Sequence, residues 1–375
     1  MRILYLHQYF RKPEEAGSHR SWYIAHALCQ AGHQVHILTA THQNKAYSEE
    51  LFPNLWVHYI SNSYHQAMGF WQRIFTFFSF VWKGLQKTKK IDFEIVYASS
   101  TPLSIGLMAL FIKKIHKKKY IFEVRDLWPQ VPIEMKILKN PLLKNLSYFL
   151  ERKIYQNAEK IVALSPAMQA HIEQIVLNKE VICVPNMADC RQFRLEERRE
   201  NRPFRLLYAG SIGLANGLER VLAWAEHCSW AEFWIVGEGA KKQTIMSLVE
   251  KKQLSNVYFF SQQNKEALQD FFSQVDAVII SFADYKILET CSPNKFFDAL
   301  AAGKVCFTNT AGWIKDLIEK HRCGFYAPTP QDFEQQLRCL QQNPATLKTM
   351  QKNARKLAEN NFERTMLCKK IVELF

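Results

Sequence analysis

Short apolar runs of strand length alternate along the chain with longer segments in which apolar residues recur every three or four positions. In the first cycle RILYLH at residues 2–7 is apolar, residues 18–31 have helical spacing, and VHILTA at residues 35–40 is apolar again. A strand, a helix and a strand in this order predict a βαβ unit with two parallel strands.

The same alternation continues to about Asn186 and starts again with RLLYAG at residues 205–210. We therefore expect an α/β protein with two doubly wound parallel sheets, each covered by helices on both faces. The other apolar runs are IVYAS near Ile95, KYIFEV near Tyr120, KIVALS near Ile161 and VICVPN near Val181 in the first half, and EFWIVG, VYFFS, AVIISF, KVCFTN and GFYAP in the second.

The length and the charge pattern predict two domains. At 375 residues, 48% of them hydrophobic, the chain can form two cores. Residues 189–204 are mostly charged and lack apolar periodicity, which is typical of a linker. We expect a first domain at residues 1–190, a second at 204–350, and a helical segment at 351–375 that crosses back to the first domain.

The net charge of +14 favours a polyanionic partner, and its distribution favours a membrane over nucleic acid. Basic residues lie beside aromatic and aliphatic ones at residues 69–90 and 108–120, and no nucleic-acid-binding motif accompanies them. Charges interrupt both runs before they reach the length that spans a bilayer. We expect an anionic membrane surface as partner. Two core helices with solvated polar ends are the alternative.

Several chemistries are not expected. The nine cysteines form no C-x-x-C pair, which argues against a metal site and against a disulfide framework. The turn after the first strand, HQYFRKPEEAG, lacks the G-x-G-x-x-G pattern of dinucleotide binding, so no cofactor is expected. The N-terminus, MRILYLHQYF, is too polar for a secretory signal, which predicts a cytoplasmic protein.

The segment SPNKFFDALAAGK predicts a short helix, with Ser292 as N-cap and Pro293 at the first helical position. Lys295 and Asp298 are three residues apart and share a helix face. They form either a surface ion pair or part of a ligand site.

Ligands of parallel sheets bind at the carboxyl ends of the strands, where helix N-termini favour phosphate groups. Glycine-bearing turns of this kind occur at Gly17, at Gly210, Gly213 and Gly217, and at Gly237 and Gly239.

The order of the motifs resembles a known family. The pattern G-x-x-R-x-x-x-L/I-A-x-x-L-x-x-x-G-H-x-V runs from Gly17 to Val35, and it is followed by VPN with Asp189, GSIGLANGL, VGEG and SPNKFFDALAAGK. The whole chain resembles the retaining GT-B glycosyltransferases of family four. RDLWP at residues 125–129 is similar to the branch of fucosamine transferases that assemble bacterial surface polysaccharides.

This resemblance implies two Rossmann-like domains that face each other across a cleft, and a metal-independent transfer with retention. The donor is expected to be a nucleotide sugar, UDP with an amino- or deoxyamino-sugar. The acceptor is expected to be linked to polyprenyl diphosphate at the cytoplasmic face of the membrane. A catalytically inactive GT-B assembly partner and a GT-B nucleotide-sugar epimerase are the alternatives.

The resemblance also implies roles for single residues. Asp298 would hold the ribose hydroxyls, and Lys295 would neutralise the diphosphate together with the amide of Asn294. The implied donor-binding residues are Gly17, Gly210, Ser211, Gly213, Asn216, Gly237, Glu238, Ser292, Pro293, Asn294, Lys295 and Asp298, and the implied catalytic residues are Asp126, Arg125, Lys295 and Glu289.

Two positions depart from the family pattern. Ser211 and Asn216 stand where many members carry Arg and Lys, so Lys295 or Arg125 is expected to supply the charge. The first glutamate of the family's E-x7-E region would fall at Thr290.

Two of the candidate acidic residues, Glu289 and Asp126, keep two interpretations each. Glu289, next to Thr290, contacts the sugar or lies in solvent. Asp126 orients the acceptor or the donor sugar, or it caps the following helix.

Overall fold

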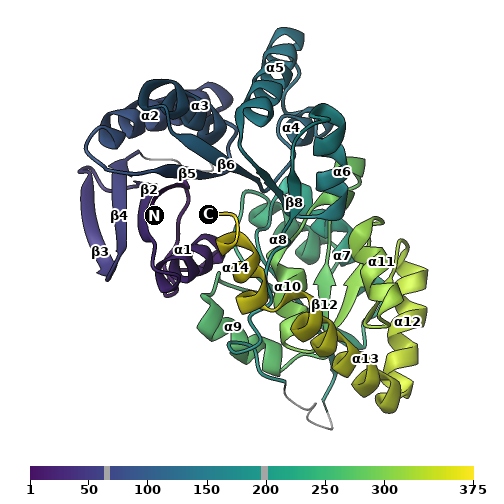
Figure 1. Cartoon of the computed structure of the whole chain (residues 1–375). Helices are drawn as coiled ribbons and strands as arrows, with labels where there is room; N and C mark the ends of the chain where they lie inside the picture. Colours follow the sequence, from purple (N-terminus) through teal and green to yellow (C-terminus); the bar gives the residue numbers. More distant parts are fainter. Residues whose placement is uncertain (63–67, 196–201) are drawn as a thin grey trace. The chain divides into compact units, whose positions relative to one another are not determined.

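The computed structural model describes residues 1–62, 68–195 and 202–375, and it divides the chain into two compact α/β units (Figure 1). The first unit comprises Met1–Lys12, Ser18–Pro185 and Thr365–Phe375, and the second comprises Pro13–Gly17 and Asn186–Arg364. The two units confirm the predicted fold class. Of the expected linker at 189–204, residues 196–201 lie outside the described residues.

The first unit is built on an eight-stranded sheet with the order β3-β4-β2-β1-β5-β6-β7-β8. Its inner strands are apolar on both faces because helices cover both sides of the sheet. The strands are β1 (Arg2–Leu6), β2 (Gln34–Thr41), β3 (Tyr47–Phe52), β4 (Leu55–Ser61), β5 (Ile95–Ser99), β6 (Lys119–Val124), β7 (Ile161–Ala163) and β8 (Val181–Cys183).

The pair β3 and β4 differs from the prediction. β4 joins the sheet parallel to β2, whereas β3 pairs antiparallel with β4 and forms the edge of the sheet. The apolar-run pattern predicted neither strand. β3, YSEELF, has no buried residue, so it lacks the apolar run that marks an inner strand.

The helices of the first unit lie on both faces of its sheet. Helix α1 covers one face, and α2, α3 and α5 cover the other (Figure 1). The latter three pack side by side: a Cβ atom at Gly84 of α2 would meet Met108 of α3, and one at Gly106 of α3 would meet Ile154 of α5. The helices are α1 (Arg20–Gln30), α2 (Phe70–Thr88), α3 (Ser104–His116), α4 (Gln130–Glu134), α5 (Pro141–Asn157) and α6 (Pro166–Ile175).

The second unit is built on a six-stranded parallel sheet with the order β11-β10-β9-β12-β13-β14. From β9 to β11 the chain adds strands toward one edge of the sheet, and from β12 to β14 it adds them toward the other edge. The boundary between β9 and β12 is therefore the switch point, where ligands bind in doubly wound sheets. The strands are β9 (Phe204–Ala209), β10 (Ala231–Val236), β11 (Val257–Phe260), β12 (Ala277–Ile280), β13 (Val305–Thr308) and β14 (Gly324–Tyr326).

Aromatic packing fills the core of the second unit. Trp224 stacks on Phe333 with ring centroids 4.2 Å apart, and Phe307 meets Phe333 edge to face. The helices are α7 (Leu218–His227), α8 (Lys242–Lys251), α9 (Lys265–Ser273), α10 (Asn294–Ala301), α11 (Trp313–Lys320), α12 (Pro330–Gln342) and α13 (Pro344–Leu357), with the short turns η1 (Leu214–Asn216), η2 (Lys286–Thr290) and η3 (Ala358–Phe362).

The last helix, α14 (Arg364–Val372), carries the chain from the second unit back to the first. Residues up to Arg364 belong to the second unit, and those from Thr365 onward belong to the first. The predicted return of the C-terminal helix is therefore observed.

Candidate active site

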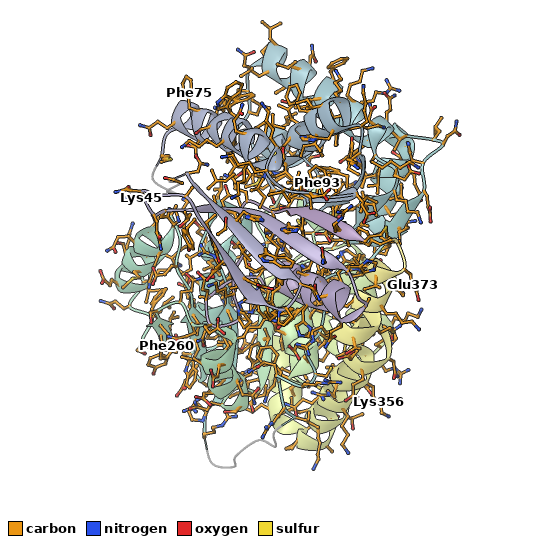
Figure 2. All side chains as sticks on the ribbon, turned by 60° about the vertical axis from the view of Figure 1, so that its left-hand side comes forward. Lys45, Phe75, Phe93, Phe260, Lys356 and Glu373 are labelled. Atoms are coloured by element: carbon orange, nitrogen blue, oxygen red, sulfur yellow. The ribbon has the colours of Figure 1, made fainter. Side chains whose placement is uncertain are left out.

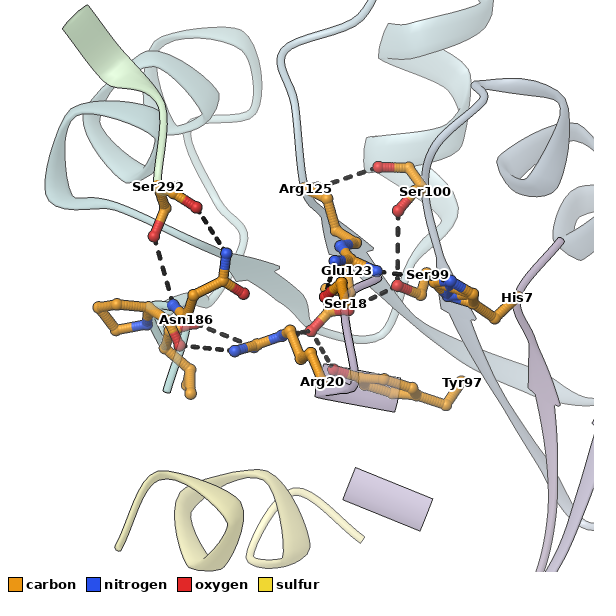
Figure 3. A network of polar contacts seen from close by, with 12 residues as sticks. His7, Ser18, Arg20, Tyr97, Ser99, Ser100, Glu123, Arg125, Asn186 and Ser292 are labelled. Atoms are coloured by element: carbon orange, nitrogen blue, oxygen red, sulfur yellow. Dashed lines mark hydrogen bonds and ion pairs between the residues drawn. The ribbon is translucent and has the colours of Figure 1, made fainter. Parts of the chain in front are cut away.

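Helix α10 begins at Asn294, one position later than the spacing predicts. The N-cap position is Pro293, and no side chain caps the helix, so the prediction that Ser292 is the N-cap is wrong. Ser292 is instead held by Asn186: the Asn186 amide N–H donates to Ser292 Oγ at 3.3 Å, and Asn186 Nδ2 donates to the Ser292 carbonyl at 2.5 Å (Figure 3). The free amides of α10 are therefore left for another partner.

Lys295 is a buried cation at this helix start. Its side chain is only 8% exposed, and its Nζ has no hydrogen-bond partner among the described residues. Nζ lies 3.9 Å from the centre of the Tyr208 ring, and a Cβ atom at Gly210 would lie 3.2 Å from Lys295 Cε. Burial lowers the pKa of Lys295 to about 7. An unpaired buried ammonium at a glycine turn fits an anionic ligand.

Asp298 does not pair with Lys295, so the alternative of a surface ion pair between them is wrong. Lys265, the first residue of α9, donates from Nζ to Asp298 Oδ1 at 2.9 Å. Both side chains are about nine-tenths buried. The carboxylate is thereby fixed near the starts of two helices that follow β11 and η2 along the chain.

Two glycine turns pack backbone against backbone at the carboxyl ends of β9 and β10. A Cβ atom at Gly237 would lie 1.9 Å from the Gly210 carbonyl oxygen, and one at Gly239 would lie 2.3 Å from the carbonyl oxygen of Ile212. The Ile212 amide donates to the Glu238 carbonyl at 2.8 Å. Gly237 and Gly239 are therefore required for packing, and this packing fixes the turn that faces Lys295.

The turn from Ser211 to Asn216 presents uncharged groups. Ser211 is exposed, and its carbonyl accepts from the Tyr208 hydroxyl at 2.6 Å. The Asn216 amide donates to the Gly213 carbonyl, and Ser281 Oγ donates to the Asn216 carbonyl at 2.7 Å. These bonds fix the backbone of the turn and add no cation to it.

The two candidate glutamates of the second unit, Glu238 and Glu289, differ in their surroundings. Glu238 is exposed and accepts from Lys242 Nζ at 2.5 Å in a surface ion pair, so its side chain already has a partner. Glu289 lies in η2 and is half-buried, and Gly312 packs on its backbone, where a Cβ atom would lie 2.6 Å from the Glu289 carbonyl oxygen. The alternative of a fully solvated Glu289 is therefore not what is observed.

Gly17 lies in the loop between β1 and α1, within a segment that belongs to the second unit. It is exposed and has φ of 134°, a conformation that favours glycine. Earlier in this loop, the Glu14 carbonyl accepts from Asn264 Nδ2 at 3.4 Å.

In the first unit, Arg125 and Asp126 follow β6. Arg125 donates from Nη2 to Ser18 Oγ at 2.9 Å, and its Nη1 lies 3.4 Å from Nε2 of His7 (Figure 3). Asp126 Oδ2 accepts from Thr101 Oγ1 at 3.2 Å, and burial raises the pKa of its carboxyl. Asp126 is not the N-cap of α4, where Pro129 stands, so the capping alternative is wrong.

Arg20 and Glu123 form a buried ion pair in the same unit (Figure 3). Arg20 Nε donates to Glu123 Oε1 at 2.8 Å, and the guanidinium also donates to the carbonyls of Val184 and Pro185. Glu123 accepts from the Tyr97 hydroxyl at 2.9 Å as well. The arginine of the G-x-x-R pattern therefore joins α1, β6 and the chain after β8, which is a structural role.

Among the described residues, no group of three or more His, Cys, Asp or Glu side chains is arranged to hold a metal ion. None of the nine cysteines, all of which lie among the described residues, forms a disulfide bond.

Two family models match the chain one after the other. The model described as Glycosyltransferase Family 4 matches residues 19–192, and the model described as Glycosyl transferases group 1 matches residues 191–357. The chain belongs to the GT-B glycosyltransferases. A curated relative is WcaI of Escherichia coli strain K12, named for colanic acid biosynthesis as a glycosyl transferase. It is 25% identical over 179 residues, and the match covers only 44% of this chain and 44% of that protein.

Solved structures of low sequence identity share the fold of this GT-B protein. Sucrose-phosphate synthase of Thermosynechococcus elongatus has a TM-score of 0.83 at 16% identity, covering 100% of this chain and 98% of its own. HepE of Anabaena, solved with UDP and glucose, has a TM-score of 0.72 at 13% identity, covering 100% and 99%. WaaG, a glycosyltransferase involved in lipopolysaccharide biosynthesis, has a TM-score of 0.70 at 14% identity, covering 99% of each chain.

Sequence reasoning missed two partners in this GT-B site, Tyr208 and Lys265. Tyr208 lies in β9 as an ordinary apolar-run residue, and Lys265 is one of many lysines. The signal available for Lys265 was its place directly after Asn264, which caps α9 by accepting from the Ala267 amide at 2.9 Å. A lysine at a helix start opposes the helix dipole and so indicates a nearby anion.

Proposed function

We propose that this protein is a retaining glycosyltransferase that moves an amino- or deoxyamino-sugar from UDP to a lipid-linked acceptor in surface-polysaccharide assembly. The observation that carries the proposal is the buried ammonium group of Lys295 beside the Gly210 turn, which has no hydrogen-bond partner in the part of the chain that the structure describes. Burying an ammonium group without a partner costs free energy, and a ligand that supplies negative charge would offset this cost.

The diphosphate of the donor is the anion that fits this position. Lys295 would face the phosphate oxygens from the start of α10, whose free amides point to the same end of the helix. Ser211 and Asn216 contribute no positive charge, so Lys295 is the cation expected to neutralise the leaving group from this unit.

Asp298, on the same helix as Lys295, is proposed to bind the nucleoside of the donor. A carboxylate can accept two neighbouring hydroxyl groups side by side, and Lys265 holds this one in place. UDP as the nucleotide is supported by HepE, which was solved with UDP and with UDP-glucose. Glu289, at the same end of the second sheet, is proposed to contact the sugar.

In the proposed reaction, the bond between the anomeric carbon and the diphosphate oxygen breaks, and its electron pair stays on the diphosphate. An acceptor hydroxyl attacks the same face of the sugar, and its proton passes to the departing diphosphate oxygen. The ammonium group of Lys295 stabilises the charge that develops on that oxygen. Loss of one such donor raises the barrier by on the order of 2.7–4 kcal/mol.

The first unit would receive the acceptor. Asp126 is proposed to orient the attacking hydroxyl, with Thr101 holding one of its oxygens, and Arg125 to supply positive charge beside it. The amino-sugar and the lipid-linked acceptor are supported by the RDLWP segment, which is similar to fucosamine transferases. The role in surface-polysaccharide assembly is supported by the names of WcaI and WaaG, which refer to colanic acid and lipopolysaccharide biosynthesis.

A screen of UDP-sugars with a polyprenyl-diphosphate-linked sugar acceptor tests this function by mass spectrometry. We expect an acceptor product heavier by one N-acetylated amino-sugar residue, with the anomeric configuration of the donor retained by NMR. UDP binding without any product would support an inactive assembly partner, an alternative favoured by the uncharged turn from Ser211 to Asn216. An isomerised UDP-sugar formed without acceptor would support an epimerase.

A further inference from the structure

The outer surface of the layer formed by α2, α3 and α5 is apolar, although these helices cover a sheet with their other side (Figure 1). Large apolar side chains are exposed on each of the three helices. Adjacent exposed apolar side chains of this number mark an interaction surface. We refer to this surface as the three-helix face.

The stripe on α2 follows helical periodicity. Phe75 and Trp82 are 73% and 67% exposed, and Phe78 between them is also exposed. Their spacing of three and four residues places them on one side of the helix, while Phe80 and Val81 are buried toward the sheet. Figure 2 shows Phe75 on the outer side of α2. The helix therefore has two apolar sides, of which only one packs in this unit.

Helices α3 and α5 continue the surface with stripes of the same spacing. Phe111 and Ile115 are exposed on α3, four residues apart. Leu142, Leu146 and Phe149 are exposed on α5 with spacing of four and three, and Leu142 is 77% exposed. Because α3 packs between α2 and α5, the three stripes belong to one continuous layer.

The charge on this face has a single sign. The sequences of α2 and α3 contain no Asp or Glu, and the one acidic residue of α5, Glu151, is buried. Exposed cations flank the apolar stripes, such as Lys114 on α3 and Lys153 on α5, whose Nζ lies 5.6 Å from the centre of the Phe149 ring. Aromatic and aliphatic side chains surrounded by lysines match the apolar interior and the anionic headgroups of a lipid surface.

We infer that the three-helix face binds the surface of an anionic lipid bilayer, with Phe75, Phe78 and Trp82 entering the interface. No described helix has the length and apolar content to cross a bilayer, so the contact is with the surface. A second copy of the chain fits less well, because a two-fold interface would bring the same lysines of both copies together. Tryptophan and phenylalanine are also the side chains that suit a membrane interface.

Flotation of the full chain with vesicles tests the inference. We expect binding to phosphatidylcholine vesicles that contain about 30% phosphatidylglycerol, and much weaker binding to pure phosphatidylcholine. Raising NaCl from about 0.1 M to about 0.5 M should weaken the binding, because it screens the lysines.

Two variants and two matched controls separate the contribution of the aromatic side chains to vesicle binding from that of the lysines. The triple variant F75S/F78S/W82S should lower the vesicle partition coefficient at least tenfold, the loss expected when one buried aromatic side chain is removed from the interface. K114E/K153E should lower it about fivefold or more for each lysine. Leu177→Ser, at a site 86% exposed outside this face, and K251E/K320E in the second unit should bind as the unaltered protein does.

Thermal unfolding and elution volume show whether the variants stay folded and whether the chain self-associates. No flotation of the unaltered protein, or equal flotation of the triple variant and the Leu177→Ser control, would overturn the inference. A dimer that the triple variant dissociates would assign the face to a second copy instead. The membrane inference does not depend on the donor site. The same variants should bind UDP with unchanged affinity. A protein that floats with vesicles but fails to bind UDP would refute only the proposed function.

Discussion

The ammonium group of Lys295 lies over the ring of Tyr208, 3.9 Å from its centre, and has no hydrogen-bond partner among the described residues. A ring face stabilises a desolvated cation by about 2 kcal/mol. Burial of this group lowers its pKa to about 7. The folded protein therefore carries a destabilising group at the position where the donor diphosphate is proposed to bind.

The first prediction concerns stability. Lys295→Met should raise the free energy of unfolding by about 1–4 kcal/mol near neutral pH, because an apolar side chain of similar length replaces a buried, unpaired ammonium. The folded pKa of about 7 lies below the unfolded value near 10.5. The stability of the unaltered protein should therefore rise between about pH 7 and pH 10.5, and the advantage of the variant should shrink over this range. Urea unfolding across this pH range measures both effects.

If Lys295→Met destabilises the protein at every pH, the lysine makes a stabilising interaction in the free state. The account of an unsatisfied cation would then be wrong.

UDP binding is predicted to be coupled to the uptake of protons by the protein. Because Lys295 is mostly neutral at pH 8 in the free protein and the diphosphate favours its charged form, UDP binding should take up protons at that pH, up to about one per bound UDP. Uptake should fall toward zero below about pH 6, where the lysine is already protonated. Calorimetric titrations in two buffers of different ionisation enthalpy measure the proton number. Uptake that persists in Lys295→Met would assign the proton to another group.

The third prediction tests the ribose contact of Asp298. If the carboxylate accepts from the ribose hydroxyls, the unaltered protein should bind UDP about tenfold or more tighter than 2′-deoxy-UDP. In Asp298→Ala this ratio should fall close to one. The ratio is insensitive to the unpairing of Lys265, since both ligands meet the same altered protein. Glu289→Ala should keep the preference, and a preference retained in Asp298→Ala would remove the ribose assignment.

The fourth prediction concerns the buried pair of Arg20 and Glu123. Both side chains are 1% exposed, so Arg20→Met should lower the free energy of unfolding by about 3–5 kcal/mol, because it leaves a carboxylate buried without its cation. The double variant R20M/E123L should lose less than the single variant, since it removes both charges. Urea unfolding at pH 7 measures both losses. A double variant that loses as much stability as Arg20→Met and Glu123→Leu lose together as single variants would show that the pair is not coupled.

The βαβ order of both units follows from the alternation of apolar runs and helical spacing, because buried parallel strands need apolar residues on both faces. The end of α10 was also predictable, since Gly303 adopts a positive φ of 60° after the last helical residue. The pairing of β3 with β4 was not, because β3 is an edge strand without a buried residue.

The contacts of the candidate site residues could not be predicted from the sequence. Lys295 and Asp298 share a helix face, which is compatible with a surface ion pair between them and with a ligand site. The partners they actually have, Tyr208 and Lys265, come from β9 and α9. Such contacts depend on the order of strands in the folded sheet, and the local spacing of residues carries no information on that order.

UDP titration of the unaltered protein, Lys295→Met and the control Lys251→Met at pH 7.5 shows whether the buried lysine binds the donor diphosphate. Lys251 ends α8 and is exposed, so its loss should leave the UDP affinity unchanged. Lys295→Met should stay folded and lose about 10–150-fold in affinity, the contribution of a hydrogen bond to a charged group. Equal affinity of Lys295→Met and the unaltered protein would contradict the claim that this buried lysine binds the donor diphosphate.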